Sequence, residues 1–423
     1  MHIKNFDPYD FNKTEISGVP VYWKNLPWAP CIHCRIVIKT GGLDDPEGKE
    51  GITHFLEHMF YQGSSKFTDE KAIAIWAKLH TFNTLNATTH LCFTGYRFEC
   101  LPESFFEAIS GLTDMVFNPL ISVKSVEEQR KVIIRETWNH YTNEKFLNYL
   151  KEYVKNIFNG HTHSRIYSTA GWPNTVSGIS QEDIVKWHKM NYGRGNFFIV
   201  LCGAVEKKHL EKLEDILKDI PMIIPPEKPI QNINKPKNRK IIKKSEDIGA
   251  SSEQASLMIK RVAPPFSETK NQTILSLRDL IKDILVERIR REQGLCYSVN
   301  VMTFLEKTYL EAWMHVKSDE NNIEIIEREF WNILKEVQEG KHRERFVVTK
   351  RIALEYLRAA ERLSSDIARD TMFDVFKHGR SVPLNEEISN LEKVTYDDVA
   401  TISKEIFDPE YVYTEIILPS KKS

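Results

Sequence analysis

The chain has 423 residues, 41% of them hydrophobic and 28% charged, and its 58 Lys and Arg against 59 Asp and Glu give a formal net charge of −1. This length exceeds what one hydrophobic core can organise, so we expect a globular protein of two or more domains. The balanced charge excludes a general attraction to nucleic acid or anionic membranes, and no run approaches the roughly 18 apolar residues of a membrane span.

The first residues, "MHIKNFDPYDFNKTEISG", contain neither the apolar core of a signal peptide nor an Arg-rich transit pattern, so the expected location is cytoplasmic. The six cysteines predict no disulfide framework in a chain of this length. Cys31 and Cys34 form a C-x-x-C pair, which could serve redox chemistry or half a zinc site. Because the pair opens the run "CIHCRIVIKTG" and no second C-x-x-C follows, a core strand is the favoured interpretation.

Residues 51–63, "GITHFLEHMFYQG", contain His-x-x-Glu-His. If this segment is helical, His54 and His58 lie at i and i+4 on one face, where both imidazoles can reach one metal ion. Glu57 lies beside them but off the ligand axis, which suits a general base better than a third ligand. The pattern is the inverzincin signature. The alternative is a buried amphipathic helix, but two histidines and a glutamate are costly to bury unless they are paired or bind metal.

A hydrolytic zinc site needs a third protein ligand and one open position. A long helical pattern begins at Ser125, and Glu136 lies in its more apolar part, between "VII" and Trp138. Spacing alone favours Glu136 only modestly over the other candidates, which are Glu127, Glu128 and His140. Gln129 shares the face of Glu136 and is expected to contact a ligand rather than the metal.

The Pro-, Asn- and Lys-rich stretch 220–254 separates two halves that resemble each other. "SQEDIVKWHKMNYGRGNFFIVLCG" from Ser180 and "TYDDVATISKEIFDPEYVYTEIILP" from Thr395 both read as a capping box, a helix and a strand. We therefore predict a duplicated α+β domain, with an N-terminal domain at 1–220, a linker at 221–250 and a C-terminal domain at 251–423.

Four blocks of the chain resemble the M16 metallopeptidase family, which includes pitrilysin, insulin-degrading enzyme and mitochondrial processing peptidase. The blocks are "GGLDDPEGKEGITHFLEHMFYQGS", "NATTHLCFTGY", "RKVIIRETW" and "IRREQGLCYSV". The resemblance implies two similar α+β domains, each a mainly antiparallel sheet packed with helices. It also implies Zn²⁺ as the cofactor, and a homodimer or a heterodimer with a related M16 subunit.

The resemblance assigns zinc binding to His54, His58 and Glu136, and the general base to Glu57. It also places Asn86 and Ala87 beside the bound peptide.

In the second half, the family's block assigns Arg290 and Tyr297 to the substrate carbonyl and the oxyanion. Without the resemblance, Arg290 would read as solvated surface and Tyr297 as half-buried core.

Two positions depart from the family pattern. Gln129 replaces a usual glutamate, which removes a negative charge near the metal. The Gly-rich turn often found before the Arg/Tyr block is absent, and "SLRDLIKDILVERIRREQG" reads as one continuous helix.

The predicted function is a zinc-dependent endopeptidase that hydrolyses short or unfolded peptides. Two alternatives remain: a non-catalytic or partner-dependent subunit of a heteromeric M16 peptidase, and a protein that captures peptides without cutting them. No nucleic-acid or membrane partner is expected.

Overall fold

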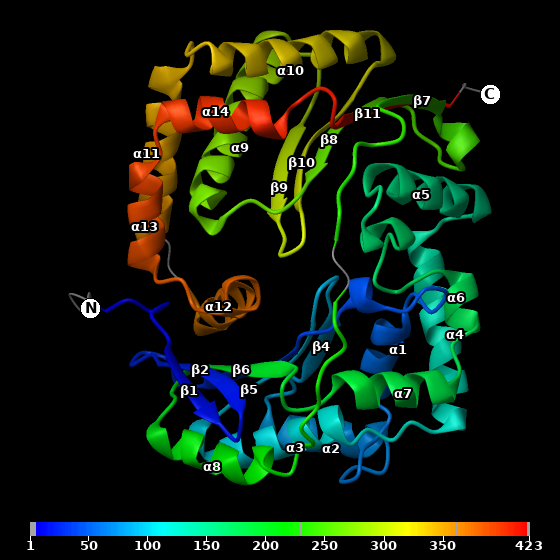
Figure 1. Cartoon of the computed structure of the whole chain (residues 1–423), viewed down its shortest axis with the longest axis vertical. Helices are drawn as coiled ribbons and strands as arrows, with labels where there is room; N and C mark the ends of the chain where they lie inside the picture. The colour runs from blue at the N-terminus through cyan, green and yellow to red at the C-terminus, as the bar shows by residue number, and fades with distance from the viewer. Residues whose placement is uncertain (1–5, 229–230, 360–361, 421–423) are drawn as a thin grey trace. The chain divides into compact units, whose positions relative to one another are not determined.

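The computed structural model describes residues 6–228, 231–359 and 362–420. The described chain forms two compact units. The first contains residues 6–140, 166–228 and 362–384, and the second contains residues 141–165, 231–359 and 385–420. Each unit is an α+β structure built on one sheet, which Figure 1 shows in the colours of the chain. The predicted fold class is confirmed.

The first unit contains a sheet of order β1-β2-β6-β3-β5-β4. Its strands are β1 (Asn12–Ile16), β2 (Val19–Asn25), β3 (Ile32–Ile38), β4 (Asn86–Thr89), β5 (Thr94–Cys100) and β6 (Phe197–Gly203). All neighbours are antiparallel except β2 and β6. The predicted core strand at the C-x-x-C pair is β3, and Cys34 is buried within it as a free thiol.

Helices cover both faces of this sheet. They are α1 (Ile52–Met59), α2 (Glu70–His80), α3 (Phe105–Phe117), α4 (Val123–His140), α6 (Pro173–Ser177), α7 (Gln181–Asn191), α8 (Lys207–Leu217) and α12 (Ser364–His378). The α3 helix contacts β5, whereas α12 contacts β3 and β6. The α12 side is fixed by a hydrogen bond of 2.8 Å between Ser364 Oγ and His33 Nε2.

The second unit repeats this plan. Its sheet has the order β7-β11-β8-β10-β9, and only β7 and β11 are parallel. The strands are β7 (Lys240–Lys244), β8 (Ala255–Ala263), β9 (Val299–Leu305), β10 (Leu310–Ser318) and β11 (Val412–Leu418). The helices are α5 (Glu144–Ile157), α9 (Asn271–Leu285), α10 (Ile323–Gln338), α11 (Arg343–Ala359), α13 (Leu384–Lys393) and α14 (Tyr396–Ile406).

The shared plan accounts for the internal repeat in the sequence. Both predicted capping boxes are present, at Ser180 before α7 and at Thr395 before α14. Each helix is followed by a strand, β6 or β11, that lies inside its sheet and pairs in parallel with a neighbour. The matched elements support a duplicated α+β domain.

The compact units do not follow the sequence boundaries 1–220 and 251–423. The α5 segment packs in the second unit, where Tyr149 donates a hydrogen bond of 2.6 Å to Glu415 on β11. The α12 segment packs in the first unit. The predicted linker also contributes β7, which pairs with β11 at the sheet edge. Each half of the sequence thus supplies a helix to the other half's sheet.

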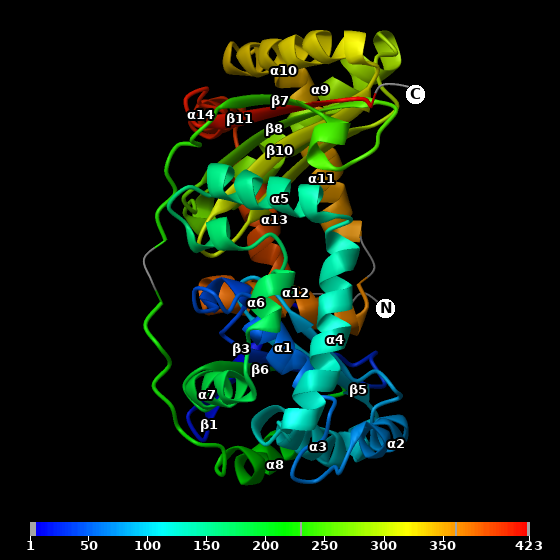
Figure 2. The same ribbon diagram turned by 90° about the vertical axis from the view of Figure 1, so that its right-hand side faces the viewer.

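Figure 2 shows α4 as one long helix that passes beside α1 and α6, and both contacts belong to the first unit. Within the described residues, no helix is long and apolar enough to cross a membrane.

Candidate metal centre

The start of α1 is fixed by two features of the preceding loop. Gly51 has φ of 101°, and a Cβ at this position would lie 2.7 Å from the carbonyl oxygen of Ala170. The buried carboxylate of Asp45 accepts hydrogen bonds from the backbone N–H groups of Gly51, at 2.7 Å, and Thr53, at 3.3 Å. These bonds satisfy N–H groups that a helix start leaves unpaired, and they fix where the first histidine lies.

Three side chains converge between α1 and α4. The Oε2 atom of Glu136 lies 3.3 Å from His58 Nε2 and 3.9 Å from His54 Nε2. The ligand atoms of the three residues all lie within 4.8 Å of one another. Ligand atoms about 2.1 Å from a tetrahedral zinc ion are separated by about 3.4 Å, so two imidazoles and one carboxylate at these distances fit zinc.

Burial keeps the His54 ring neutral. Burial, with the nearby charges of His58 and His140, lowers the pKa of His54 to about 3. A neutral imidazole is the form that binds a metal. The Nδ1 atom of His54 is buried and has no hydrogen-bond partner among the described residues.

Glu57 lies at the side of this triangle. Its Oε2 is 4.0 Å from His54 Nε2, and its side chain is 12% exposed. Thr89 on β4 donates a hydrogen bond of 2.9 Å to the same oxygen. Burial raises the pKa of Glu57, and the Thr89 hydrogen bond opposes that rise. A carboxylate oriented beside the ligands, and not among them, suits proton transfer.

The α4 helix contributes a second contact to the ligands. Gln129 Oε1 lies 3.1 Å from His58 Nδ1, which leaves His58 Nε2 directed at Glu136. A partner on the outer ring nitrogen fixes the tautomer of a metal-binding histidine. The structure thus places the Gln129 side chain beside His58, and its support of a metal ligand stays a prediction.

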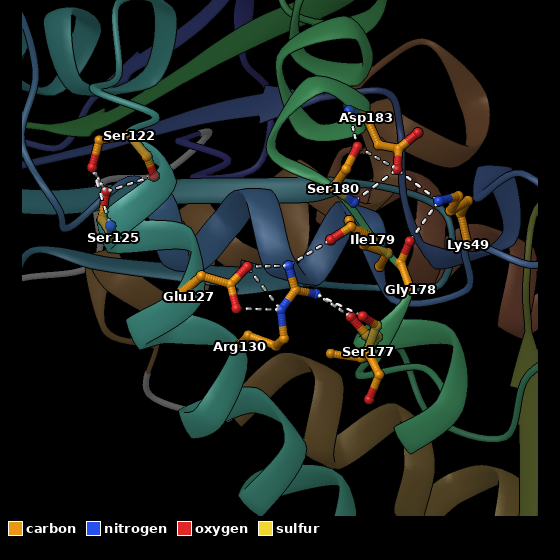
Figure 3. A network of polar contacts seen from close by, with 11 residues as sticks. Lys49, Ser122, Ser125, Glu127, Arg130, Ser177, Gly178, Ile179, Ser180 and Asp183 are labelled. Carbon is orange, nitrogen blue, oxygen red and sulfur yellow. Dashed lines mark hydrogen bonds and ion pairs between the residues drawn. The ribbon is translucent and has the colours of Figure 1, made fainter.

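Arg130 holds α4 against the rest of the first unit (Figure 3). It donates hydrogen bonds of 2.6 Å to the carbonyl oxygens of Val176 and Ile179, and it pairs with Glu127 at 2.9 Å. Its guanidinium also lies 5.4 Å from the ring centroid of Phe55, the neighbour of His54. One side chain thus links α4, α1 and the loop before α7.

Lys49 anchors the same loop from the opposite side. Its Nζ donates hydrogen bonds of 2.7 Å to the carbonyl of Gly178 and 2.6 Å to Asp183 (Figure 3). Asp183 also closes the capping box with Ser180. The loop that receives Arg130 is therefore rigidly placed.

The other candidates for the third ligand are occupied elsewhere or directed away. Glu127 pairs with Arg130, and Glu128 lies 4.0 Å from Lys124 on the exposed side of α4. His140, at the exposed end of the helix, lies near enough to affect the pKa of His54, but it is not among the three residues whose ligand atoms lie within 4.8 Å of one another.

The β4 strand forms one edge of the first sheet and pairs only with β5 among the described strands. Asn86 and Thr88 are exposed, whereas Ala87 and Thr89 are buried. Since Thr89 contacts Glu57, the buried side of this edge borders the α1 site.

Arg290 and Tyr297 belong to the second unit. Arg290 lies in a π-helical turn, η6 (Val286–Glu292), that directly continues α9. The predicted continuous helix is thus present through Glu292. The Arg290 guanidinium is 5.5 Å from the Tyr297 ring centroid, and Tyr297 is 85% exposed. The alternative reading of Tyr297 as half-buried core does not describe it.

Sequence reasoning did not identify Asp45, Thr89 or Arg130. Asp45 acts through a turn, and Thr89 and Arg130 act through contacts between distant segments. The only local signal was the position of Arg130 directly after Gln129.

Comparison with known proteins places these features in a family. Residues 21–169 match Insulinase (Peptidase family M16), and residues 178–351 match the Peptidase M16 inactive domain. An "Uncharacterized zinc protease" of Rickettsia felis is 21% identical over 417 residues, or 94% of this chain and 95% of that protein. Insulin-degrading enzyme-like 2 of Arabidopsis thaliana is 24% identical over 187 residues, which cover 43% of this chain and 19% of that longer protein.

The first half of the periplasmic protease PqqL from Escherichia coli has a similar structure, with a TM-score of 0.83 over 98% of this chain and 93% of that chain. The sequence identity is 15%, so this likeness establishes the fold alone. The two family matches and the full-length relative together show that the chain belongs to the M16 peptidase family.

Proposed function

We propose that this chain is a zinc-dependent endopeptidase of the inverzincin type that hydrolyses short or unfolded peptides. The observation that carries the proposal is the convergence of His54, His58 and Glu136, with the Glu57 carboxylate beside them. Family membership supports the same chemistry.

His54, His58 and Glu136 would hold the metal, and Gln129 would orient His58 from behind. When bound, zinc supplies a water of lowered pKa and a Lewis acid for the peptide carbonyl. Glu57 accepts a proton from the attacking water and returns it to the nitrogen of the leaving amine. Thr89 holds the Glu57 carboxylate in place for both transfers.

The substrate would add to the free edge of β4, near Asn86 and Ala87. Backbone hydrogen bonding to a sheet edge recognises main chain more than side chains, and it requires an extended peptide. This requirement is the reason for proposing short or unfolded substrates. Arg290 and Tyr297 are assigned to the oxyanion by the family resemblance, and their exposure on the second unit is compatible with that role.

The second candidate is a partner-dependent subunit, which is favoured by one observation. Gln129 is neutral where the family usually has a glutamate, so zinc affinity in the isolated chain is expected to be lower. Dimerisation, with a second copy or a related M16 subunit, belongs to this proposal.

The test is hydrolysis of a mixed set of unstructured peptides by the purified chain, measured by mass spectrometry. We expect cleavage that a zinc chelator abolishes and that added zinc restores. Cleavage that persists in the chelator would refute the zinc proposal. Protein that binds zinc stoichiometrically but cleaves nothing alone would support the subunit candidate.

A further inference from the structure

The face of the first sheet that carries α12 contains a cavity of about 380 Å³. It is bounded by β3, β4, β5 and α12, and all its lining residues belong to the first unit. Three arginines line it: Arg35, Arg97 and Arg369. Gly95 leaves it open at the β5 wall, because a Cβ there would meet nothing closer than 3.7 Å.

Two of these arginines are unfavourably close. Arg35 and Arg97 are directly opposite in the antiparallel register of β3 and β5. Like charges in this arrangement destabilise a sheet unless an anion lies between them. Burial, together with the charges of Arg97 and Arg369, lowers the pKa of Arg35 to about 10.

The guanidinium groups of this pair are poorly satisfied by the protein. Arg35 Nε is buried and has no hydrogen-bond partner among the described residues, and Arg35 Nη2 reaches only the carbonyl of Ser365, at 3.5 Å. The Arg97 side chain is exposed and has no hydrogen bond or ion pair within the described part of the chain. Donors that are held together without an acceptor are suited to an anion, and a carboxylate matches their planar geometry.

The nearby acids form their direct ion pairs with residues other than Arg35 and Arg97. Asp366 lines the cavity, but it pairs with Arg369 at 2.8 Å, and Asp370 pairs with the same arginine at 3.0 Å. Glu99 lies 3.7 Å from His33. Within the described part of the chain, Arg35 and Arg97 thus have no ion pair of their own, and their guanidinium donors are left for a ligand.

The cavity adjoins the strand along which the substrate is proposed to bind. Thr88 on β4 lines it, and Arg97 is opposite Asn86 in the β4–β5 register. The exposed side chains of β4 alternate with Ala87 and Thr89, which face the α1 site. In a peptide added to this edge, every second side chain would point to the arginine side of the sheet.

We propose that Arg97, together with Arg35, binds a carboxylate of the substrate peptide and thereby selects acidic peptides. The carboxylate belongs either to an Asp or Glu side chain or to the peptide C-terminus. The inference rests on the proposed binding of peptide along β4, and it assigns a specificity that backbone pairing alone does not provide.

The experiment compares paired peptides that differ only by Glu or Gln at each position near a cleaved bond, each with a free or an amidated C-terminus. Selectivity is the ratio of kcat/KM for the acidic and the neutral peptide. One charge-assisted hydrogen bond predicts a ratio of about 10 or more in the wild type. We expect Arg97→Gln to lower the ratio about tenfold and Arg97→Lys to restore part of it.

Two further variants separate the cavity from a general effect of charge. Gly95→Leu places a side chain in the cavity and should lower the ratio without changing any charge. Lys71→Gln removes an exposed positive charge on α2 and should leave the ratio unchanged. Loss of the preference on amidation identifies the C-terminal carboxylate, and loss on Glu-to-Gln exchange identifies the side chain.

Binding of the same peptides to the Glu57→Gln variant, by fluorescence anisotropy, gives the ratio independently of turnover. Absence of hydrolysis would then refute the proposed function, while the binding ratio would still decide this inference. Equal affinity for acidic and neutral peptides, no peptide binding at all, or a preference that survives Arg97→Gln would overturn it.

Discussion

Arg130 offers a sharp test of how the metal centre is assembled, because it acts on the ligands without touching them. Replacing it with glutamine removes the hydrogen bond of 2.6 Å to Ile179 (Figure 3) and the one of 2.6 Å to Val176. It also removes the contact with the Phe55 ring. The α4 helix, which carries Glu136, would then lose its main polar attachment to the loop before α7.

The magnitude follows from the contacts. Hydrogen bonds to a charged donor contribute about 1.5–3 kcal/mol each, and a cation–π contact adds about 0.5–1 kcal/mol. The Arg130 side chain is 12% exposed, so solvent weakens these contacts only in part. Since burying the guanidinium has its own cost, we expect Arg130→Gln to lower the free energy of unfolding by about 2–4 kcal/mol. For a unit of this size, that shifts Tm by about 4–16 °C.

The assay measures thermal unfolding and zinc affinity, the second by competition with a chromophoric chelator. We expect zinc affinity to fall about tenfold or more, because Glu136 and Gln129 are displaced with α4. Lys131→Gln is the matched control, since it removes the same charge from the exposed side of the same helix. An Arg130→Gln protein that loses stability but keeps full zinc affinity would refute the link between the Arg130 contacts and the metal centre.

Three other predictions concern single positions. Gln129→Glu should increase zinc affinity about tenfold in the same competition assay, because His58 would donate to a charged acceptor; an unchanged affinity would contradict this. Gly51→Ala should lower the free energy of unfolding by about 1–3 kcal/mol in denaturant titrations, because alanine is strained at φ of 101°. An unfolding midpoint equal to that of the wild type would contradict the positive φ of residue 51 at the start of α1. Burial lowers the pKa of His161 from 6.5 to about 4, so the unfolded chain takes up a proton at a higher pH than the folded chain does. The neutral buried ring is therefore fully tolerated above pH 6.5, and the fold loses stability as the pH falls from 6.5 toward 4. Between pH 7 and pH 5 the wild type should lose about 1–2 kcal/mol more stability than His161→Asn, which keeps an acceptor for the His163 N–H; parallel losses would exclude this effect.

Local sequence patterns were sufficient for the elements and for placing His54, Glu57 and His58 on one helix, whereas the choice of Glu136 depended on the family resemblance. The helical spacing of His54 and His58 places both on one face of α1, and the capping boxes at Ser180 and Thr395 mark real helix starts. The repeat of capping box, helix and strand predicted two related sheets. These features depend on residues close together in the sequence.

The exchange of helices between the units could not be read in this way. Nothing within residues 144–157 shows that α5 packs on the second sheet, because the partners of Tyr149 and Asn156 are Glu415 and Asn238, far along the chain. The same reason hid the contacts of Arg130, whose acceptors are backbone carbonyls at the end of α6 and in the loop that follows it. Backbone acceptors have no residue identity that a sequence pattern could reveal.

We propose that α1 and α4 hold a metal while Glu57 performs proton transfer. The most direct measurement is zinc content and peptide turnover of Glu57→Gln beside the wild type, with each protein first stripped of metal and then reloaded with zinc. We expect the variant to bind one zinc per chain, like the wild type, but to lose nearly all turnover. A variant that still hydrolyses peptides at the wild-type rate with zinc bound would contradict the role of Glu57, and a wild type that binds no zinc would contradict the metal centre itself.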